Sequence, residues 1–343
     1  MNKTCIKGMN LAELQTLCLE AGESCFRGGQ LFEWMYRQGI SSFDSMLNVN
    51  KSFRGHLEEN YILWTLDVET QKVSQQDQSV KILFKTQDGE FIETVSMVDG
   101  HRHTVCISSQ VGCVLDCSFC ATGSLRFKRN LTTGEIVDQL IYVRREVDHP
   151  ITNVVFMGMG EPFHNYDNVL NAADIFHSPK GFNIGSTRIT ISTAGLLPQI
   201  QRFINENRRY KLAISLNAAD DGVRNKIMPI NKKWNIKDLI QAGKEYSNQK
   251  KRIIMFEYVL LKGLNDSESD ALQLSHLLQG IPCKLNIIPF NETDGKYQRP
   301  DNDVITHFSE ILHKNRDGYR VLVRWSKGQD IDAGCGQLAG QIL

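Results

Sequence analysis

The chain has 343 residues, 41% of them hydrophobic and 23% charged, and its 39 basic side chains balance its 39 acidic ones. This composition is ordinary for a soluble globular protein, and no apolar run approaches the roughly 20 residues of a membrane-spanning helix. Because residues 1–18 also lack the apolar segment of a secretory signal, we expect a cytoplasmic protein with no membrane partner.

The first 60 residues are predicted to be helical. Leu11, Leu14 and Leu17 fall on one face of a helix, and a second apolar pattern occupies residues 31–35. We therefore expect a small helical N-terminal domain over residues 1–60.

A strand-like pattern follows over residues 61–100. Two segments of strand composition, residues 81–86 and 90–97, flank the pair Asp88-Gly89. An Asp-Gly pair between two such segments is typical of a tight turn in a β-hairpin. The sequence thus predicts a β-hairpin extension between the helical domain and the rest of the chain.

Strand and helix patterns alternate over residues 101–325, with helical stretches at residues 133–147 and 267–278. Such alternation implies a parallel sheet, and six units predict an α/β fold with a partial (β/α)6 barrel. These barrels bind ligands at the carboxyl ends of their strands. A C-terminal tail, residues 326–343, completes the chain. The predicted strands lie at residues 105–109, 153–158, 188–192, 211–216, 253–261 and 283–290.

Nine cysteines are many for a cytoplasmic protein, in which closely spaced cysteines are more often metal ligands or catalysts than disulfides. Cys113, Cys117 and Cys120 follow the spacing C-x3-C-x2-C. Three thiolates on a short loop can ligate three irons of a [4Fe–4S] cluster and leave the fourth iron free to bind a small molecule. The spacing alone leaves two alternatives open, a zinc site completed by a distant His or Cys and a set of packed cysteines.

Three motifs carry a resemblance to one family. The cysteine segment, with Phe119 as an aromatic residue before the last cysteine, is similar to the signature of radical S-adenosylmethionine (SAM) enzymes. The sequence G-M-G-E-P at residues 158–162 resembles the motif with which that superfamily binds the amino group of SAM. The tail around Cys335 resembles one branch, the RNA adenine methyltransferases of the RlmN and Cfr type. The match covers about residues 81–340 and, more weakly, the N-terminal helices.

The resemblance implies a radical mechanism with a [4Fe–4S] cluster on the three loop cysteines and two molecules of SAM per turnover. One SAM methylates Cys335. A 5′-deoxyadenosyl radical from the second SAM takes a hydrogen atom from that methyl group, and the methylene radical adds to adenine. Glu93 is implied as the base that removes the ring proton. Cys106 is implied as the thiol that releases the product by forming a disulfide with Cys335.

The family match also assigns seven residues to SAM binding. They are Gly160, Glu161, Ser192, Ser215, Leu216, Asn217 and Asn291. The chain departs from the family pattern at two positions. Asn217 stands where many relatives have His, so a contact there would come from the backbone. Gly334 stands where Ala is usual, next to Cys335.

The implied substrates are an adenosine in the peptidyl transferase region of 23S rRNA and adenosine 37 of tRNA, both methylated at carbon 2. One alternative is methylation of carbon 8 of the same rRNA adenosine, as in Cfr-type enzymes. Another is a non-catalytic zinc-binding RNA module, which would have no use for Cys106 and Cys335. The resemblance further implies an electron donor such as flavodoxin, an N-terminal domain that docks RNA, and a monomer. Arg126, Lys128 and Arg129 follow the cluster loop and are the candidate contacts to RNA phosphates.

Overall fold

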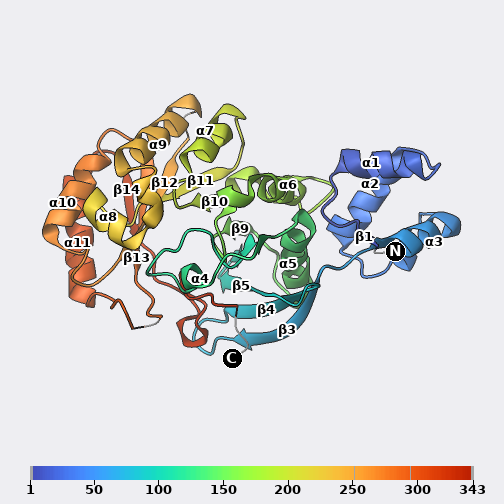
Figure 1. Ribbon diagram of the computed structural model, residues 1–343, viewed down its shortest axis with the longest axis horizontal. Helices are drawn as coiled ribbons and strands as arrows, with labels where there is room; N and C mark the ends of the chain where they lie inside the picture. The colour runs from blue at the N-terminus through green and yellow to red at the C-terminus, as the bar shows by residue number, and fades with distance from the viewer. Residues whose placement is uncertain (1–2, 251, 294, 341–343) are drawn as a thin grey trace.

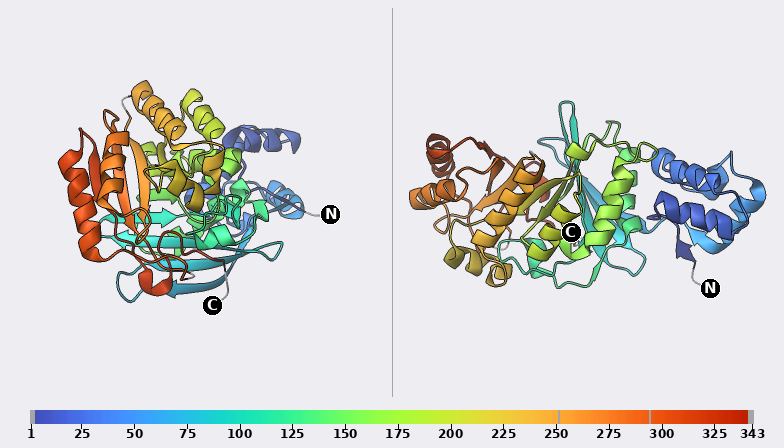
Figure 2. Two further views of the ribbon diagram at one scale, coloured as in Figure 1. Left: turned by 60° about the vertical axis from the view of Figure 1, so that its left-hand side comes forward. Right: turned by 90° about the horizontal axis from the view of Figure 1, so that it is seen from above.

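The computed structural model describes residues 3–250, 252–293 and 295–340, and it has two parts, a helical N-terminal lobe and a larger α/β body (Figures 1 and 2). The helices predicted for the start of the chain are present, and a short parallel pair of strands joins the two ends of the lobe. The lobe contains β1 (Thr4–Cys5), α1 (Leu11–Glu20), α2 (Phe26–Phe32), a π-helical segment (Glu33–Gln38), a 3-10 turn (Phe43–Ser45), α3 (Lys51–Asn60) and β2 (Tyr61–Ile62).

Helix α1 begins at a capping signal in the sequence. The Asn10 side chain accepts a hydrogen bond from the backbone nitrogen of Glu13 at 3.0 Å, and the Glu13 carboxylate accepts one from the backbone nitrogen of Asn10 at 2.7 Å. This reciprocal pair satisfies two donors that the start of a helix otherwise leaves open. Leu14, Leu17 and Cys18 are buried, so the predicted apolar face packs inward.

A buried ion pair fastens the lobe to the body. Lys7 Nζ lies 2.8 Å from Asp138 Oδ1, and both side chains are at most 1% exposed. Asp138 also accepts hydrogen bonds from the backbone nitrogen of Thr65 at 2.8 Å and from its hydroxyl at 2.6 Å. The Lys7 ammonium lies 3.6 Å from the centre of the Trp64 ring. Because Asp138 belongs to α5 (Thr133–Glu146), residues on both sides of the lobe are bound to one helix of the body.

A ten-stranded sheet forms the centre of the body. In sheet order its strands are β14 (Arg320–Val323), β13 (Cys283–Pro289), β12 (Ile254–Leu260), β11 (Lys211–Ser215), β10 (Ile189–Thr193), β9 (Asn153–Phe156), β6 (Arg102–Cys106), β5 (Phe91–Asp99), β4 (Val80–Thr86) and β3 (Leu66–Val73). Strands β4 and β5 form the predicted hairpin, and β3 adds a third antiparallel strand to it. Strand β6 pairs antiparallel with β5 and parallel with β9, so it joins this extension to the barrel.

Strand β6 and strands β9 to β14 are parallel and, with the helices between them, form an open barrel, which confirms the predicted fold class (Figure 1). Strand β14 was not predicted, because it lies at the edge of the sheet and its exposed Arg320 and Leu322 interrupt the apolar pattern. The connecting helices are α5, α6 (Tyr166–His177), α7 (Leu197–Asn205), α9 (Ile236–Lys250), α10 (Glu268–Leu277) and α11 (Asn302–Asn315). The loops contain α4 (Ala121–Ser124), α8 (Asp221–Ile227) and a strand pair, β7 (Gln110–Val111) and β8 (Arg129–Asn130).

The register of the barrel strands determines which side chains share a layer inside it. Ser215 on β11 pairs with Glu257 on β12, and Glu257 pairs with Asn286 on β13. Since side chains alternate along a strand, residues two positions away on each strand face the same interior. Within the described segments, no helix is long and apolar enough to cross a membrane.

Candidate active site

Cys113, Cys117 and Cys120 lie on one loop between β7 and α4. The backbone nitrogen of Cys120 donates to the carbonyl oxygen of Cys117 at 3.1 Å, which tightens the loop. Gly112 stands at the start of the loop with a φ of +71°, and a Cβ there would lie 2.3 Å from the carbonyl oxygen of Arg126. Glycine is therefore required where the start of the loop passes the chain that leaves it.

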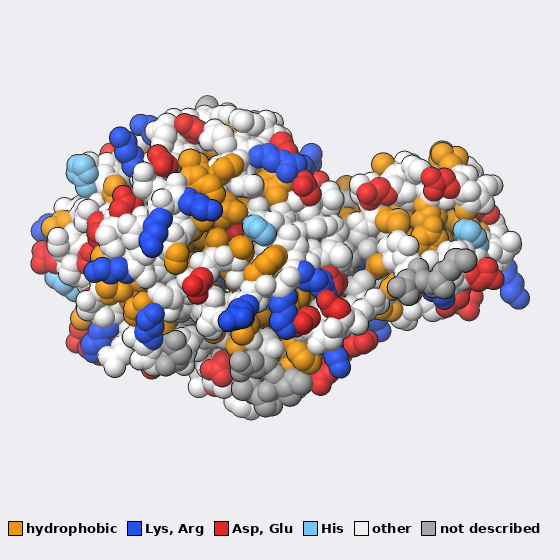
Figure 3. Space-filling model, in the orientation of Figure 1, with side chains coloured by type: hydrophobic (Ala, Val, Ile, Leu, Met, Phe, Trp, Pro, Cys, Tyr) orange, Lys and Arg blue, Asp and Glu red, His pale blue; other side chains and the backbone are white. Residues whose placement is uncertain are grey.

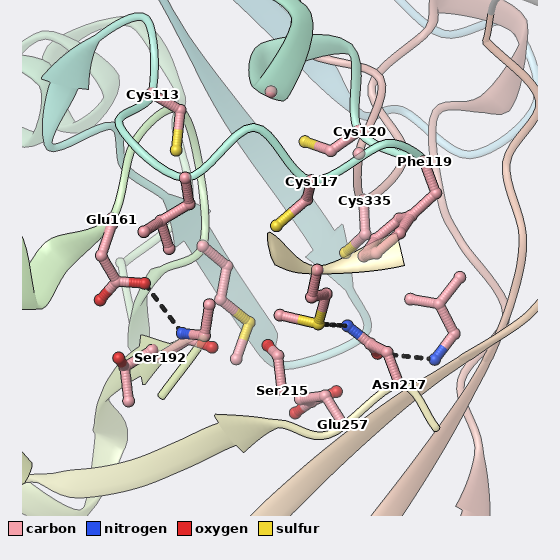
Figure 4. Close-up of a pocket in the computed structure, with 18 of the residues that line it drawn as sticks. Cys113, Cys117, Phe119, Cys120, Glu161, Ser192, Ser215, Asn217, Glu257 and Cys335 are labelled. Atoms are coloured by element: carbon pink, nitrogen blue, oxygen red, sulfur yellow. Dashed lines mark hydrogen bonds between the residues drawn. The ribbon is translucent and has the colours of Figure 1, made fainter. Parts of the chain in front are cut away.

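The three thiols line one cavity, which we call the cluster cavity (Figure 4). Burial raises the pKa of all three thiols, so a metal bound here must displace their protons. Among the described residues, no three His, Cys, Asp or Glu side chains are grouped as a single metal ion would require. Thiolates that bind three different irons do not need to converge on one point. The donor set therefore fits a [4Fe–4S] cluster better than a mononuclear zinc site.

Glu161 follows β9 and also lines the cluster cavity. Its Oε1 accepts a hydrogen bond from the backbone nitrogen of Phe163 at 2.9 Å, and its Oε2 accepts one from that of Ala194 at 2.8 Å. Burial raises the pKa of this carboxyl to about 7. The neighbouring Gly160 has a φ of +95°, and a Cβ there would lie 2.4 Å from the Cβ of Gln110. When ionised, this oriented carboxylate can bind an ammonium group.

Three further predicted SAM-binding residues line the same cavity: Ser192 on β10, Ser215 at the end of β11, and Asn217 (Figure 4). Asn217 has a left-handed backbone with a φ of 58°. Its Oδ1 accepts a hydrogen bond from the backbone nitrogen of Val259 at 2.9 Å, and its Nδ2 lies 3.3 Å from Met228 Sδ. The Asn217 side chain is thus engaged within the protein and shapes the wall of the cavity.

Leu216 and Asn291 lie beside the cluster cavity and not in its wall. Leu216 is fully buried, and its backbone nitrogen donates to the carbonyl oxygen of Glu257 at 3.0 Å. The Asn291 side-chain nitrogen donates to the carbonyl oxygen of Cys335 at 3.0 Å. A Cβ on Gly334 would lie 2.7 Å from Asn291 Cγ, so glycine at this position lets the tail approach Asn291. Asn291 therefore orients the loop that carries Cys335.

Cys335 lies where two cavities meet. It lines the cluster cavity and also a second cavity, whose wall includes Cys106 at the end of β6. We call this second cavity, shared by Cys335 and Cys106, the lower cavity. The backbone nitrogen of Ala121 donates to the carbonyl oxygen of Gly336 at 2.7 Å, which holds the Cys335 loop against α4. Burial raises the pKa of Cys106 to about 12, and the neighbouring Cys335 adds to this effect. The structure thus brings the two predicted reactive cysteines together as free thiols.

Glu93 is buried on β5 with 3% of its surface exposed, although a lone Glu on a strand is more often solvated. Its Oε2 accepts hydrogen bonds from the backbone nitrogens of Ala339 at 2.7 Å and Gly340 at 3.0 Å. Its Oε1 lies 3.3 Å from Lys81 Nζ. Glu93 lines a third cavity, the Glu93 cavity, whose wall includes Cys117. The predicted base is therefore placed between the cluster loop and the C-terminal tail.

The sequence did not identify two charged residues of the site, Glu257 on β12 and Arg324 after β14. Glu257 lines the cluster cavity and accepts a hydrogen bond from Asn286 at 2.9 Å, while its buried Oε2 has no hydrogen-bond partner among the described residues. Arg324 lines both the cluster cavity and the lower cavity, and Cys335 is the main cause that raises its pKa. The Glu within the otherwise apolar strand 254–260 could have indicated a functional residue. Burying a charged side chain costs free energy, so such a residue is seldom present for packing alone.

The basic segment that follows the cluster loop is largely neutralised. Arg129 lies 2.6 Å from Asp88 and 2.8 Å from Glu135, and Lys128 pairs with a third carboxylate. Arg126 is exposed and forms no ion pair with any residue that the structure describes. Of the three predicted contacts to RNA phosphates, Arg126 is therefore the one whose charge is not already neutralised. On the face shown in Figure 3, Lys and Arg are interspersed with Asp and Glu and do not form one basic stripe.

Comparison with known proteins identifies the family. Residues 107–274 match the radical SAM superfamily, and residues 4–63 match the ribosomal RNA large subunit methyltransferase N-terminal domain. The chain is 43% identical over 343 residues to the dual-specificity RNA methyltransferase RlmN of Geotalea uraniireducens, with 100% of this chain and 98% of that protein covered. The chain belongs to the RlmN family of radical SAM methyltransferases.

Two further relatives agree with membership of the RlmN family. The protein of that name from Pseudomonas fluorescens is 39% identical over 351 residues, covering 99% of this chain and 91% of its own. The crystal structure of a radical SAM methyltransferase from Sphaerobacter thermophilus has a TM-score of 0.94 and 40% identity, covering 98% of this chain and 100% of that one. Membership implies that the chain is an enzyme with a [4Fe–4S] cluster and SAM. The alternative of a non-catalytic zinc module therefore does not hold.

Proposed function

We propose that the chain methylates carbon 2 of an adenosine in the peptidyl transferase region of 23S rRNA and of adenosine 37 in tRNA, in the cytoplasm. The observation that carries the proposal is that the tail holding Cys335 lies against both Cys106 and Glu93, next to the cluster loop. Two relatives named as dual-specificity RNA methyltransferases support two RNA substrates.

The cluster cavity provides for SAM. Cys113, Cys117 and Cys120 would hold the cluster, which would supply the electron that cleaves SAM. Glu161 binds the ammonium group of SAM, and Ser192 and Ser215 offer hydroxyls to its polar groups. The free Oε2 of Glu257 adjoins Ser215 in the strand register, and a carboxylate at such a position suits the hydroxyls of a ribose.

Cys335 receives a methyl group from one SAM and donates it, as a methylene group, to the adenine ring after a second SAM has been cleaved. Two SAM are therefore used in each turnover. The nucleophile toward the first SAM is the sulfur of Cys335, and the guanidinium of Arg324, whose pKa Cys335 raises, lies near it. Asn291 fixes the loop through the carbonyl oxygen of Cys335.

Glu93 removes the proton from the ring carbon once the methylene bridge to Cys335 has formed, and the cluster, oxidised when SAM is cleaved, would accept the unpaired electron that the adduct carries. Its ion pair with Lys81 and its contacts to the tail keep the carboxylate oriented toward the Cys335 loop. Cys106 then attacks the sulfur of Cys335, which breaks the bond between sulfur and the methylene carbon. The methylene carbon keeps the electron pair of that bond and takes up a proton, which makes it the methyl group. The products are methylated RNA and a Cys106–Cys335 disulfide.

We propose that a small electron-transfer protein such as flavodoxin supplies the electron. The exposed charge of Arg126 next to the cluster loop supports contact with an acidic partner there. We also propose that the protein acts as a monomer. The helical lobe, fastened to the barrel by the Lys7–Asp138 pair, is the proposed RNA-docking part.

Methylation of defined RNAs tests the proposed function. The reconstituted enzyme, given SAM with a labelled methyl group and a reductant, should label a 23S rRNA fragment of the peptidyl transferase region and a tRNA anticodon stem-loop. RNAs that carry guanosine at the target position are the matched controls and should remain unlabelled. Labelling that is equal in target and control RNAs, or absent from both target RNAs, would overturn the proposal.

A further inference from the structure

The lower cavity has a volume of about 480 Å³ and extends from Cys120, on the cluster loop, to the amino-terminal ends of strands β10, β11 and β13. Lys211 and Ser215 are at opposite ends of β11 on one face of the strand; Ser215 lines the cluster cavity and Lys211 lines the lower cavity. The lower cavity opens to solvent, because Leu322 and Trp325 in its wall are 51% and 50% exposed. It is therefore a second route to the interior of the barrel.

Besides Arg324 and Lys327, three cations converge on this cavity. Arg102, Lys211 and Lys284 line it, and none of them forms an ion pair with a residue that the structure describes. Burial lowers the pKa of Lys211, and Lys284 and Arg102 lower it further, which shows that these charges act on one another. The acidic residue in the wall, Asp99, is already paired with Lys327 at 3.2 Å. The cavity is thus prepared for an anion.

Two thiols lie in the wall of the same cavity. Cys335 lines both the lower cavity and the cluster cavity. Of the three cavities described, Cys106 lines only the lower one. If the proposed function is correct, these two sulfurs form a disulfide at the end of each turnover. We propose that the lower cavity binds a small thiol that carries carboxylate groups, and that this thiol reduces the Cys106–Cys335 disulfide.

The reduction balances with two molecules of the thiol. The first thiolate attacks one sulfur of the disulfide, so that a mixed disulfide forms and the other cysteine leaves as a thiolate and takes up a proton. The second thiolate attacks the sulfur of the bound small molecule. This step releases the oxidised thiol as a symmetrical disulfide and restores the second cysteine. Two electrons pass from the two thiols to the protein, and Arg324 beside both cysteines stabilises the leaving thiolates.

Size and placement favour a small molecule over the other possible occupants. A volume of about 480 Å³ falls within the range of roughly 300–1,000 Å³ typical of small-molecule sites. Cys106 is 8% exposed, so a thiol on the surface of a folded protein cannot approach it. The base Glu93 lines a different cavity, which places the adenine of the RNA on that side and leaves the lower cavity open.

The test is the rate of disulfide reduction in cluster-loaded enzyme that has been oxidised with one equivalent of diamide. Peptide mass spectrometry verifies the Cys106–Cys335 bond before the assay. Glutathione is the anionic probe and 2-mercaptoethanol is the neutral one. In the double variant K211Q/K284Q, glutathione should reduce the bond about tenfold more slowly than in the wild type, because a cavity of one charge sign concentrates ligands of the opposite sign. Added salt should slow glutathione in the wild type in the same way.

The neutral thiol and a surface variant control the measurement. The rate with 2-mercaptoethanol should stay within about twofold in K211Q/K284Q, because neutral ligands do not respond to the field. The variant K233Q, which removes an exposed lysine elsewhere, should behave as the wild type with both thiols. Equal effects on the two thiols, or none, would overturn the proposal. So would loss of RNA methylation by the pre-reduced K211Q/K284Q variant, which would assign the cavity to RNA. The exchange assay needs no RNA, so failure of the proposed function would be seen separately, in wild-type methylation.

Discussion

The carboxylate of Glu93 accepts a hydrogen bond from the backbone nitrogen of Ala339 at 2.7 Å, so the proposed base also anchors the tail that carries the methyl group. The two residues are 246 positions apart in the chain. Removing the side chain would therefore affect both proton transfer and the position of the tail. A pair of variants can separate these effects.

Glu93→Gln keeps an oxygen that can accept from the Ala339 nitrogen but cannot take up a proton. We expect this variant to methylate Cys335 at near the wild-type rate and to accumulate RNA bound covalently to Cys335. Glu93→Ala should in addition methylate Cys335 about fivefold more slowly, since loss of a hydrogen bond of about 1 kcal/mol loosens the tail. Peptide mass spectrometry for methylated Cys335 and a denaturing gel for the adduct give the two readouts. Normal product release by Glu93→Gln would contradict its role as the base.

Cys106→Ala should also stop with RNA attached through Cys335, because the thiol that attacks the Cys335 sulfur is missing. The measurement is a denaturing gel of protein purified from cells, before and after ribonuclease treatment. Cys283→Ala is the matched control, since Cys283 is a buried cysteine on β13 that belongs to no motif. A single unshifted band from Cys106→Ala, together with normal methyl transfer, would show that Cys106 does not resolve the adduct.

SAM binding should depend on pH through Glu161. Burial raises the pKa of this carboxyl from 4.5 to about 7, and its ionised form binds the ammonium of SAM. The affinity for SAM should fall as the pH is lowered through about 7, while Glu161→Gln binds weakly at every pH. The sign for folding is opposite: a raised pKa contributes stability below pH 4.5 that is lost as the pH rises through about 7. Equilibrium dialysis between pH 6 and about 8.5 would detect the change in affinity, and a flat wild-type profile would count against this assignment.

Asp138→Asn should destabilise the chain, because it leaves the Lys7 ammonium buried without its partner. We expect the free energy of unfolding to fall by about 3–5 kcal/mol, the usual cost of breaking a buried ion pair. Glu33→Gln, which breaks an exposed pair with Arg37 in the same lobe, should cost less than about 1 kcal/mol. Urea denaturation followed by circular dichroism compares the two. Equal losses would mean that the buried pair does not hold the lobe.

The fold could be predicted from the sequence because most of its barrel strands are apolar and its helices separate them clearly. The turn at Asp88-Gly89 was found for a similar reason, since few pairs of residues suit it. Strand β14 was missed because it lies at the edge of the sheet and only one of its four residues is buried, whereas the equally short β9 has three buried residues, and Arg324 was missed with it.

Motifs in the sequence identified the reactive residues of the site. They did not identify the residues that contact these reactive residues. Periodicity could not show that Glu93 is buried, because its partners at residues 339 and 340 come from the far end of the chain. Periodicity also could not show that Arg129 forms ion pairs with Asp88 and Glu135 and so has no charge left for RNA. The lower cavity combines residues from eight separate strands, and no local pattern indicates such a combination.

The most direct test of the proposed function is the identity of the methylated nucleoside. We would delete the gene in a bacterium that encodes this chain, digest its 23S rRNA and tRNA to nucleosides, and analyse them by mass spectrometry with synthetic standards. The same strain complemented with the wild-type chain or with Cys335→Ala completes the set. The account predicts 2-methyladenosine in both RNAs with the wild-type chain and in neither RNA with Cys335→Ala. The appearance of 8-methyladenosine instead, or of 2-methyladenosine with Cys335→Ala, would contradict it.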